Sequence, residues 1–255
     1  MFDPIKIAFS HYLERFFAEL VPTNREIERY IERPSSTAIL YAPGRMVDSV
    51  EDMLAKWRKL DQGHTVKGYP APVMIFAMDR NLTPTGRDYT RQLAEKTMVT
   101  ISDDPKKRVF GLKTIAADVR LQTAIISHLE PTARSIAAQL LLYVDSMDAR
   151  RFTAEYAFAG FKTRWPVQIE SPETPAMLIP LPPENNLMCY TVDLNLHCSI
   201  PLFYAPKIGE ANDGKGTPGD ADDPAGYPVV KQITIKSCGR CAPHEVKAEE
   251  AEAGN

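Results

Sequence analysis

The feature that most constrains the fold is the stretch from Cys189 to Tyr204, which reads CYTVDLNLHCSIPLFY. Its apolar positions are Tyr190, Val192, Leu194, Leu196, Cys198 and Ile200, and its polar positions are Thr191, Asp193, Asn195, His197 and Ser199. Strict alternation is typical of a strand with one buried and one solvated face. Eleven such residues would extend roughly 36 Å, about twice an ordinary strand. Pro201 cannot donate to a ladder, so we expect it to end the pairing or to mark a sheet edge.

A second stretch, Ile115 to Ser127, alternates in a similar way and is expected to pair with the first, with Val109 as an earlier possible start. Between the two lies Thr132 to Met147, where apolar residues recur at helical spacing and form a stripe able to cover the sheet. Pro131 suits the first helical position. The sequence therefore predicts an α+β fold: a mixed, mainly antiparallel sheet with helices packed on one face, plus extended loops.

Helices and strands are also predicted at the N-terminal end. Asp3 and Pro4 suit the start of a helix, and Pro22 stops it. Its apolar face is expected to dock on the core, which is the favoured interpretation; its many aromatic residues keep open the alternative that it packs on a neighbouring subunit. Further predicted elements are a short helix capped by Asn24 and ending near Ile31, a helix from Met46 to Leu60, and strands at Thr37–Tyr41 and Pro72–Met78.

Composition limits the classes of function. The net charge of −3 and the pI near 6.0 argue against a general binder of nucleic acid or membrane surfaces. No apolar run approaches the ~20 residues that cross a bilayer, and four cysteines are too few for a disulfide scaffold. We expect a soluble protein made in a reducing cytoplasm. The predicted domains are 1–36, a helical segment; 37–206, the central α+β domain; and 207–255, a flexible loop, a possible last strand and a frayed tail.

Three segments are harder to assign. Pro172 to Pro183 contains five prolines and is expected to be an extended arm or a loop. Lys207 to Gly226 is rich in glycine and aspartate and nearly lacks apolar residues, which predicts a segment that is mobile or ordered only by a partner. Phe152 to Phe161 is ambiguous, and Trp165 to Glu170 favours a strand.

Residues able to bind a metal are few. The strongest cluster is Cys238, Cys241 and His244, spaced C-x2-C-x2-H. Zinc usually takes four ligands, so a fourth would have to come from Cys189, His197 or Cys198. His197 and Cys198 should face opposite sides of a strand and could not easily both join. Two ordinary thiols remain the favoured interpretation, and no cofactor is expected.

Catalytic and phosphate-binding motifs of the common families do not occur. Asp79 and Arg80 end a buried strand, where α/β enzymes place catalytic groups, although a structural ion pair or surface turn is favoured. The aspartates between Asp213 and Asp223 lack the order of a calcium loop. Side chains interpreted as surface or packing residues are Arg87, Tyr89, Arg91, His11, His64 and His128.

This order of elements, a helix, a mixed sheet, and a long strand, crossing helix and long strand, resembles the neck proteins of long-tailed bacteriophages, particularly contractile-tailed ones, and among them the tail-terminator type. The resemblance covers Thr37 to Tyr204 and depends on pattern. The chain departs from the family by its larger size, its proline-rich segment, its Asp/Gly-rich loop and its C-x-x-C tail, and these departures leave open a terminator, gateway or collar ring. It implies a structural virion protein and not an enzyme: a homo-oligomeric ring, typically six-fold, that caps the tail tube and joins it to the head connector. The implied neighbours are tail tube, sheath and collar proteins, with DNA passing through the lumen without sequence-specific contact.

The same resemblance places the protein at the virion neck, after assembly in the host cytoplasm. Pro201, Leu202, Phe203 and Tyr204 are then candidates for an interface patch, although core packing is the favoured interpretation of these residues. Two other functions stay open: a metal-binding interaction module that uses Cys238, Cys241 and His244, and an α/β enzyme with a site near Asp79.

Overall fold

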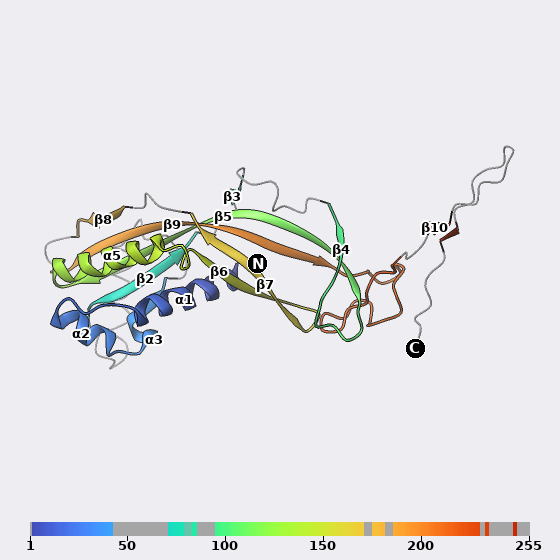
Figure 1. Cartoon of the computed structure of the whole chain (residues 1–255), viewed down its shortest axis with the longest axis horizontal. Helices are drawn as coiled ribbons and strands as arrows, with labels where there is room; N and C mark the ends of the chain where they lie inside the picture. The colour runs from blue at the N-terminus through green and yellow to red at the C-terminus, as the bar shows by residue number, and fades with distance from the viewer. Residues whose placement is uncertain are drawn as a thin grey trace. The chain divides into compact units, whose positions relative to one another are not determined.

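A computed structural model describes residues 2–42, 71–79, 81, 83–85, 95–170, 175–181, 186–229, 233–234 and 247–248 (Figure 1). The helices are α1 Asp3–Ala18, α2 Arg25–Ile31, α3 Ser35–Ala38 and α5 Glu130–Asp145. The strands are β1 Ile39–Tyr41, β2 Val73–Met78, β3 Thr83–Pro84, β4 Thr97–Thr100, β5 Val109–Ser127, β6 Arg151–Phe158, β7 Phe161–Ile169, β8 Ala176–Ile179, β9 Met188–Tyr204, β10 Ile233–Thr234 and β11 Lys247–Ala248.

Nine of the described strands form one mixed, mostly antiparallel sheet, so the predicted α+β class is confirmed. Its main order is β1-β2-β5-β9-β7-β6; β3 and β4 also pair with β5, and β8 pairs with β9. The strands β10 and β11 form a separate antiparallel pair. The predicted helix at Met46–Leu60 lies outside the described residues.

The chain divides into two compact units, each built from three separate stretches of sequence. Unit 1 comprises Met1–Arg91, Ala116–Glu155 and Arg164–Ile200, and unit 2 comprises Gln92–Ile115, Tyr156–Thr163 and Pro201–Asn255. The strands β5, β6, β7 and β9 contribute residues to both units. This division differs from the predicted sequential domains, because the long strands share their residues between two cores.

The two predicted long strands are present and are neighbours in the sheet (Figure 1). Strand β5 has 19 residues and starts at Val109, and β9 has 17; the mean strand has about 5–6. In β9 the expected alternation of burial holds from Val192 to Ile200. Contrary to expectation, β9 continues through Pro201, which is itself buried, to Tyr204.

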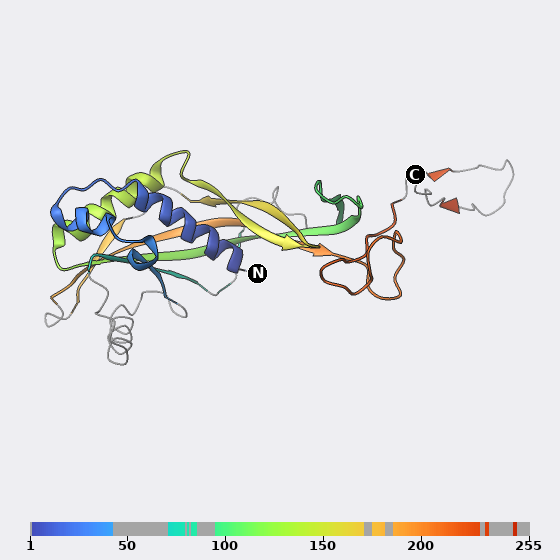
Figure 2. The same ribbon diagram turned by 90° about the horizontal axis from the view of Figure 1, so that it is seen from below.

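In unit 1, α1 and α5 lie on the same side of the sheet (Figure 2). The predicted apolar face of α1 is buried, and Phe9 stacks on Tyr12 and contacts Phe76 of β2 and Phe152 of β6. Helix α5 begins two residues earlier than predicted, with Pro131 in its first turn, and buries its apolar stripe. The helix α1 therefore docks on the protein's own core, which was the favoured interpretation.

The other side of β2 faces a separate apolar cluster, so this strand is buried on both faces as its continuous apolar run predicts. The cluster contains Val73, Ile75, Ala77, Ala124, Ile126 and Cys189, with Leu40, Ala42, Ile179, Leu181 and Leu187 packed against it. Asn24 caps α2 as expected, since its side chain accepts a hydrogen bond from the Ile27 amide. The strand predicted from Thr37 starts only at Ile39, because residues 35–38 form the short helix α3.

The ambiguous region after α5 forms a β-hairpin of β6 and β7. Burial in β6 alternates perfectly along its first seven residues. The turn consists of Ala159 and Gly160, whose φ angles are 54° and 76°. Two consecutive positive φ angles are typical of a type I′ turn, whose twist matches that of the flanking strands.

Candidate functional site

Ionisable side chains gather on the solvated face of the sheet in unit 1, where they pair with one another. The Arg120 Nη2 atom donates to the Asp193 Oδ2 atom at 2.6 Å. His197 Nδ1 lies 2.6 Å from Asp118 Oδ1, and its Nε2 lies 3.8 Å from Glu170 Oε2. These half-buried pairs link β5 to β9 and to the residue that follows β7. Their geometry serves pairing between strands, and pairs that remain partly open to solvent contribute up to about 1 kcal/mol each.

The cysteines of β9 are buried and inert. Cys189 and Cys198 are free thiols, and burial raises the pKa of each to about 12. Cys198 is buried and His197 half-buried on alternate positions of the strand, as the sequence predicts. Protonated, enclosed thiols are poor metal ligands because the thiolate is the ligand. The candidates Cys238, Cys241 and His244 lie outside the described residues. Among the described residues, no group of three or more His, Cys, Asp or Glu side chains could hold a metal ion.

The other sequence candidates are dispersed. Asp79 follows β2 and accepts hydrogen bonds from the Asn81 amide and side chain, so both its carboxylate oxygens are used in a local turn. His11 pairs with Glu14 on the exposed surface of α1, and His128 contacts the Asn186 carbonyl. The remaining candidates lie outside the described residues: Arg80, Arg87, Tyr89, Arg91 and His64.

Unit 2 is organised around Arg108, which is only 2% exposed. Its Nε and Nη2 atoms contact the two carboxylate oxygens of Asp104 at 2.7 and 3.2 Å. Its Nη1 atom donates to Asp223 Oδ1 at 2.6 Å and to the Pro224 carbonyl at 3.0 Å. The guanidinium also lies near the rings of Phe110 and Phe161. Every part of this planar cation therefore has a partner.

The electrostatics of this cluster follow from its geometry. The hydrogen bond from Arg108 to Asp104 raises the pKa of the guanidinium further. Burial acts to raise the pKa of Asp104, but the hydrogen bonds from Arg108 and from the Lys106 amide outweigh it and leave that pKa below its ordinary value. The hydrogen bond from Lys106 lowers the pKa of Asp223. The cluster is thus fully ionised at neutral pH.

The glycine- and aspartate-rich segment from Lys207 to Gly226 packs against this cluster. The sequence instead predicts that this segment is mobile or ordered only by a partner. Asp223 and Pro224 contact Arg108, the Thr217 amide donates to the Asp223 carbonyl at 2.7 Å, and Ala225 is fully buried. Gly216 has a φ of +76°, and a Cβ there would lie 2.4 Å from the Pro224 carbonyl oxygen. Only glycine fits this approach. Described aspartates such as Asp220 accept bonds from nearby amides within the loop.

The candidate interface patch splits into buried and exposed residues. Pro201 is buried, and Phe203 stacks on Phe158 with ring centroids 4.7 Å apart in the apolar cluster of unit 2. Leu202 is half-buried, and Tyr204 is 40% exposed. Core packing, the favoured interpretation of this patch, holds for Pro201 and Phe203, whereas Tyr204 is exposed.

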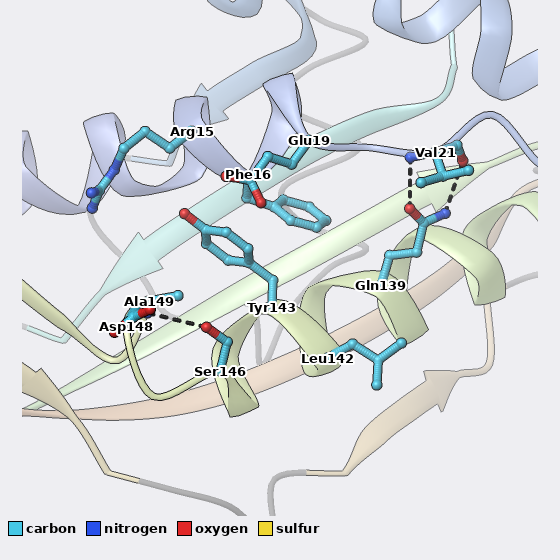
Figure 3. Close-up of a pocket in the computed structure, with 10 residues that line it drawn as sticks. All are labelled: Arg15, Phe16, Glu19, Val21, Gln139, Leu142, Tyr143, Ser146, Asp148 and Ala149. Carbon is cyan, nitrogen blue, oxygen red and sulfur yellow. Dashed lines mark hydrogen bonds between the residues drawn. The ribbon is translucent and has the colours of Figure 1, made fainter.

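A groove of about 640 Å³ lies between the C-terminal halves of α1 and α5 in unit 1 (Figure 3). Gln139 closes one end through two hydrogen bonds with the Val21 backbone. The full lining is Arg15, Phe16, Glu19, Val21, Gln139, Leu142, Tyr143, Ser146, Asp148 and Ala149. Sequence reasoning missed this groove because its two walls are more than a hundred residues apart and neither carries a motif.

The groove combines apolar surface with charged side chains. Leu142 and Val21 are 73% and 62% exposed. Arg15, Glu19 and Asp148 form no ion pair within the described part of the chain. No described helix is long and apolar enough to cross a membrane. Neither a scan against protein-family models nor a search of curated protein sequences gives a match for this chain.

Proposed function

We propose that this protein is a structural subunit of a ring at the neck of a long-tailed bacteriophage, of the tail-terminator type. In this role about six copies cap the tail tube and join it to the head connector, with sheath and collar proteins as neighbours and DNA passing through the lumen. The protein assembles in the host cytoplasm and resides in the virion. No cofactor takes part, and no catalytic residue is assigned.

The observation that carries the proposal is the pair of long neighbouring strands, β5 and β9, of 19 and 17 residues. On their solvated face, charged side chains pair across the strands, as Arg120 does with Asp193 and His197 with Asp118. These charges hold neighbouring strands together and do not line a cleft. A surface of this kind suits a wall repeated by symmetry, where head-to-tail contacts close into a ring.

The proposal is tested by the oligomeric state. Purified protein is imaged by negative-stain electron microscopy and weighed by light scattering, alone and after incubation with phage tail tubes. We expect closed rings, either free or bound at the tube end. A monomer in both settings contradicts the proposal.

A matched pair of variants then examines the candidate interface. Tyr204 is exposed, so Tyr204→Ser is expected to leave the fold intact and to weaken ring assembly. Phe203 packs against Phe158, so Phe203→Ser is expected to unfold unit 2. Circular dichroism separates the two effects. Normal ring assembly by Tyr204→Ser would remove Tyr204 from the interface.

A further inference from the structure

Strand β6 is the longest open edge among the described strands of the main sheet. It lies at one end of the strand order, and no described strand pairs with its outer side. The other marginal strands, β1, β3, β4 and β8, have two to four residues. Strand β6 has eight and contains neither proline nor lysine. Proteins usually keep edge strands short, or protect them with proline, lysine or a bulge, because an open edge pairs with other strands.

The backbone of β6 presents alternate residues to this open edge. The Arg150 carbonyl accepts a hydrogen bond from the Ile169 amide of β7 at 2.9 Å. Hydrogen-bonding direction alternates along a strand, so the even-numbered residues of β6 pair with β7. Arg151, Thr153 and Glu155 therefore direct their amides and carbonyls outwards. A further strand can hydrogen-bond to these groups without disturbing β7.

The side chains of the outward-bonding residues make this edge complementary to itself. They are exposed, whereas Phe152 and Ala154 between them are buried, and Phe152 contacts the Phe9 ring of α1. Arg151 and Glu155 carry opposite charges and lie two residues to either side of Thr153. Reversing the strand about Thr153 exchanges the two charges. An identical strand that runs the other way therefore presents a carboxylate to each guanidinium.

We propose that the β6 strands of two copies of this protein pair antiparallel across a two-fold axis at Thr153. Arg151 of each copy then lies opposite Glu155 of the other, and the two Thr153 side chains face each other. Roughly six backbone hydrogen bonds join the sheets, with one ion pair at either end. The same arrangement exists within the molecule, where Arg120 of β5 pairs with Asp193 of β9 at 2.6 Å.

Charge selects this register over its neighbours. A pair of strands centred on Glu155 places the two carboxylates opposite each other, and one centred on Arg151 does the same with the guanidinium groups. Like charges directly opposite destabilise a sheet. A pair centred on Ala154 leaves neither charge opposite its counter-charge. Glu155 also has an interaction within its own chain, and a carboxylate with two oxygens can accept from more than one donor.

Sedimentation of the full chain tests the contact. Its two-fold axis is separate from the head-to-tail contacts of a ring, so the contact doubles the mass of a monomer or of a ring alike. Thr153→Pro removes an amide that β7 does not use, and we expect a folded protein of half the wild-type mass at about 100 µM. Thr153→Val keeps the amide and should match the wild type. Equal masses of the wild type and Thr153→Pro overturn the proposal.

Charge reversal identifies the occupant of the edge. Arg151→Glu and Glu155→Arg should each raise the dissociation constant of the contact about ten-fold, because each places like charges opposite one another at both ends. The double variant Arg151→Glu/Glu155→Arg should return it to within about three-fold of the wild type. Arg134→Glu, exposed on α5, is the control and should change nothing. A double variant as weak as the single variants indicates a different register or a strand of another protein, and overturns the proposal.

Hydrogen exchange locates the contact on the strand. The amides of Thr153 and Glu155 should be protected at high protein concentration and exchange faster on dilution. The amides of Phe152 and Ala154, which face β7, should stay protected throughout. Exchange at Thr153 that does not depend on concentration overturns the proposal. Because ring formation on tail tubes is measured separately, failure of this proposal leaves the proposed function standing.

Discussion

Unit 1 and unit 2 are stabilised by different physical means, although β5 and β9 contribute to both. Unit 1 buries aromatic rings between α1, α5 and the sheet, with Phe9 and Tyr12 fully enclosed. Unit 2 has a small phenylalanine cluster and a buried cation, Arg108, that binds an otherwise polar loop. A large apolar core tolerates the loss of one polar contact, whereas a loop fixed by one cation depends on that cation.

The largest effect should come from the aromatic core of unit 1. Phe9→Ala removes a fully buried ring that contacts Tyr12, Phe76 and Phe152, so we expect a loss of about 4 kcal/mol in the free energy of unfolding. Urea denaturation measures it. Ile7→Ala on the same helix, at a side chain 54% exposed, is the control and should cost less than about 0.5 kcal/mol.

Removal of the buried cation should come next. Arg108→Met leaves the carboxylate of Asp104 buried with its backbone hydrogen bonds but without the guanidinium that balances its charge, which we expect to cost about 3 kcal/mol. Hydrogen exchange should speed up in residues 207–227 while the amides of α1 keep their protection. The double variant Arg108→Met/Asp104→Leu should recover part of the loss. Unchanged exchange in the loop would show that unit 2 does not depend on this cluster.

Acid should weaken unit 2 by a smaller amount. The pKa of Asp104 is lowered from 3.8 in the folded protein, so its contribution is present above about pH 4 and is lost as pH falls through the lower, folded pKa. Asp223 acts in the same direction. Hydrogen exchange of the loop between pH 5 and pH 2.5 measures this loss. In Asp104→Asn the dependence should be reduced, and an equal dependence in that variant would exclude Asp104 as its source.

The smallest effect should come from the cap of α2 in unit 1. Asn24 accepts a hydrogen bond from the Ile27 amide and donates one to Thr132 Oγ1. We expect Asn24→Ala to cost about 1 kcal/mol. Asn24→Asp keeps the acceptor and should cost less, and thermal unfolding followed by circular dichroism compares the two. Equal losses would assign the effect to the Thr132 contact.

Elements with strong local periodicity could be predicted from the sequence. The long strands, α1 and α5 follow from alternation and helical spacing over eleven or more residues. The β6–β7 hairpin was missed because Ala159–Gly160 is a less familiar type I′ pair than Asn-Gly, although Phe152, Ala154 and Tyr156 alternate clearly.

Features that depend on distant residues could not be predicted. The loop closure joins Arg108 to Asp223, which are 115 residues apart, and composition alone indicates a solvated segment. Pro201 remains within β9 although proline has no amide hydrogen to donate. The groove forms only because α1 and α5 lie side by side, and the local sequence pattern of one helix does not indicate which other helix packs against it.

The buried thiols of β9 give the sheet a built-in reporter. Cys189 and Cys198 are enclosed and stay protonated at neutral pH, so an alkylating reagent reaches them only when the strand is exposed. Their rate of alkylation, followed by peptide mass spectrometry, therefore measures how often β9 becomes exposed to solvent. Incorporation into a larger particle would slow the alkylation of these two thiols, so the decrease in their rate reports assembly without an added label.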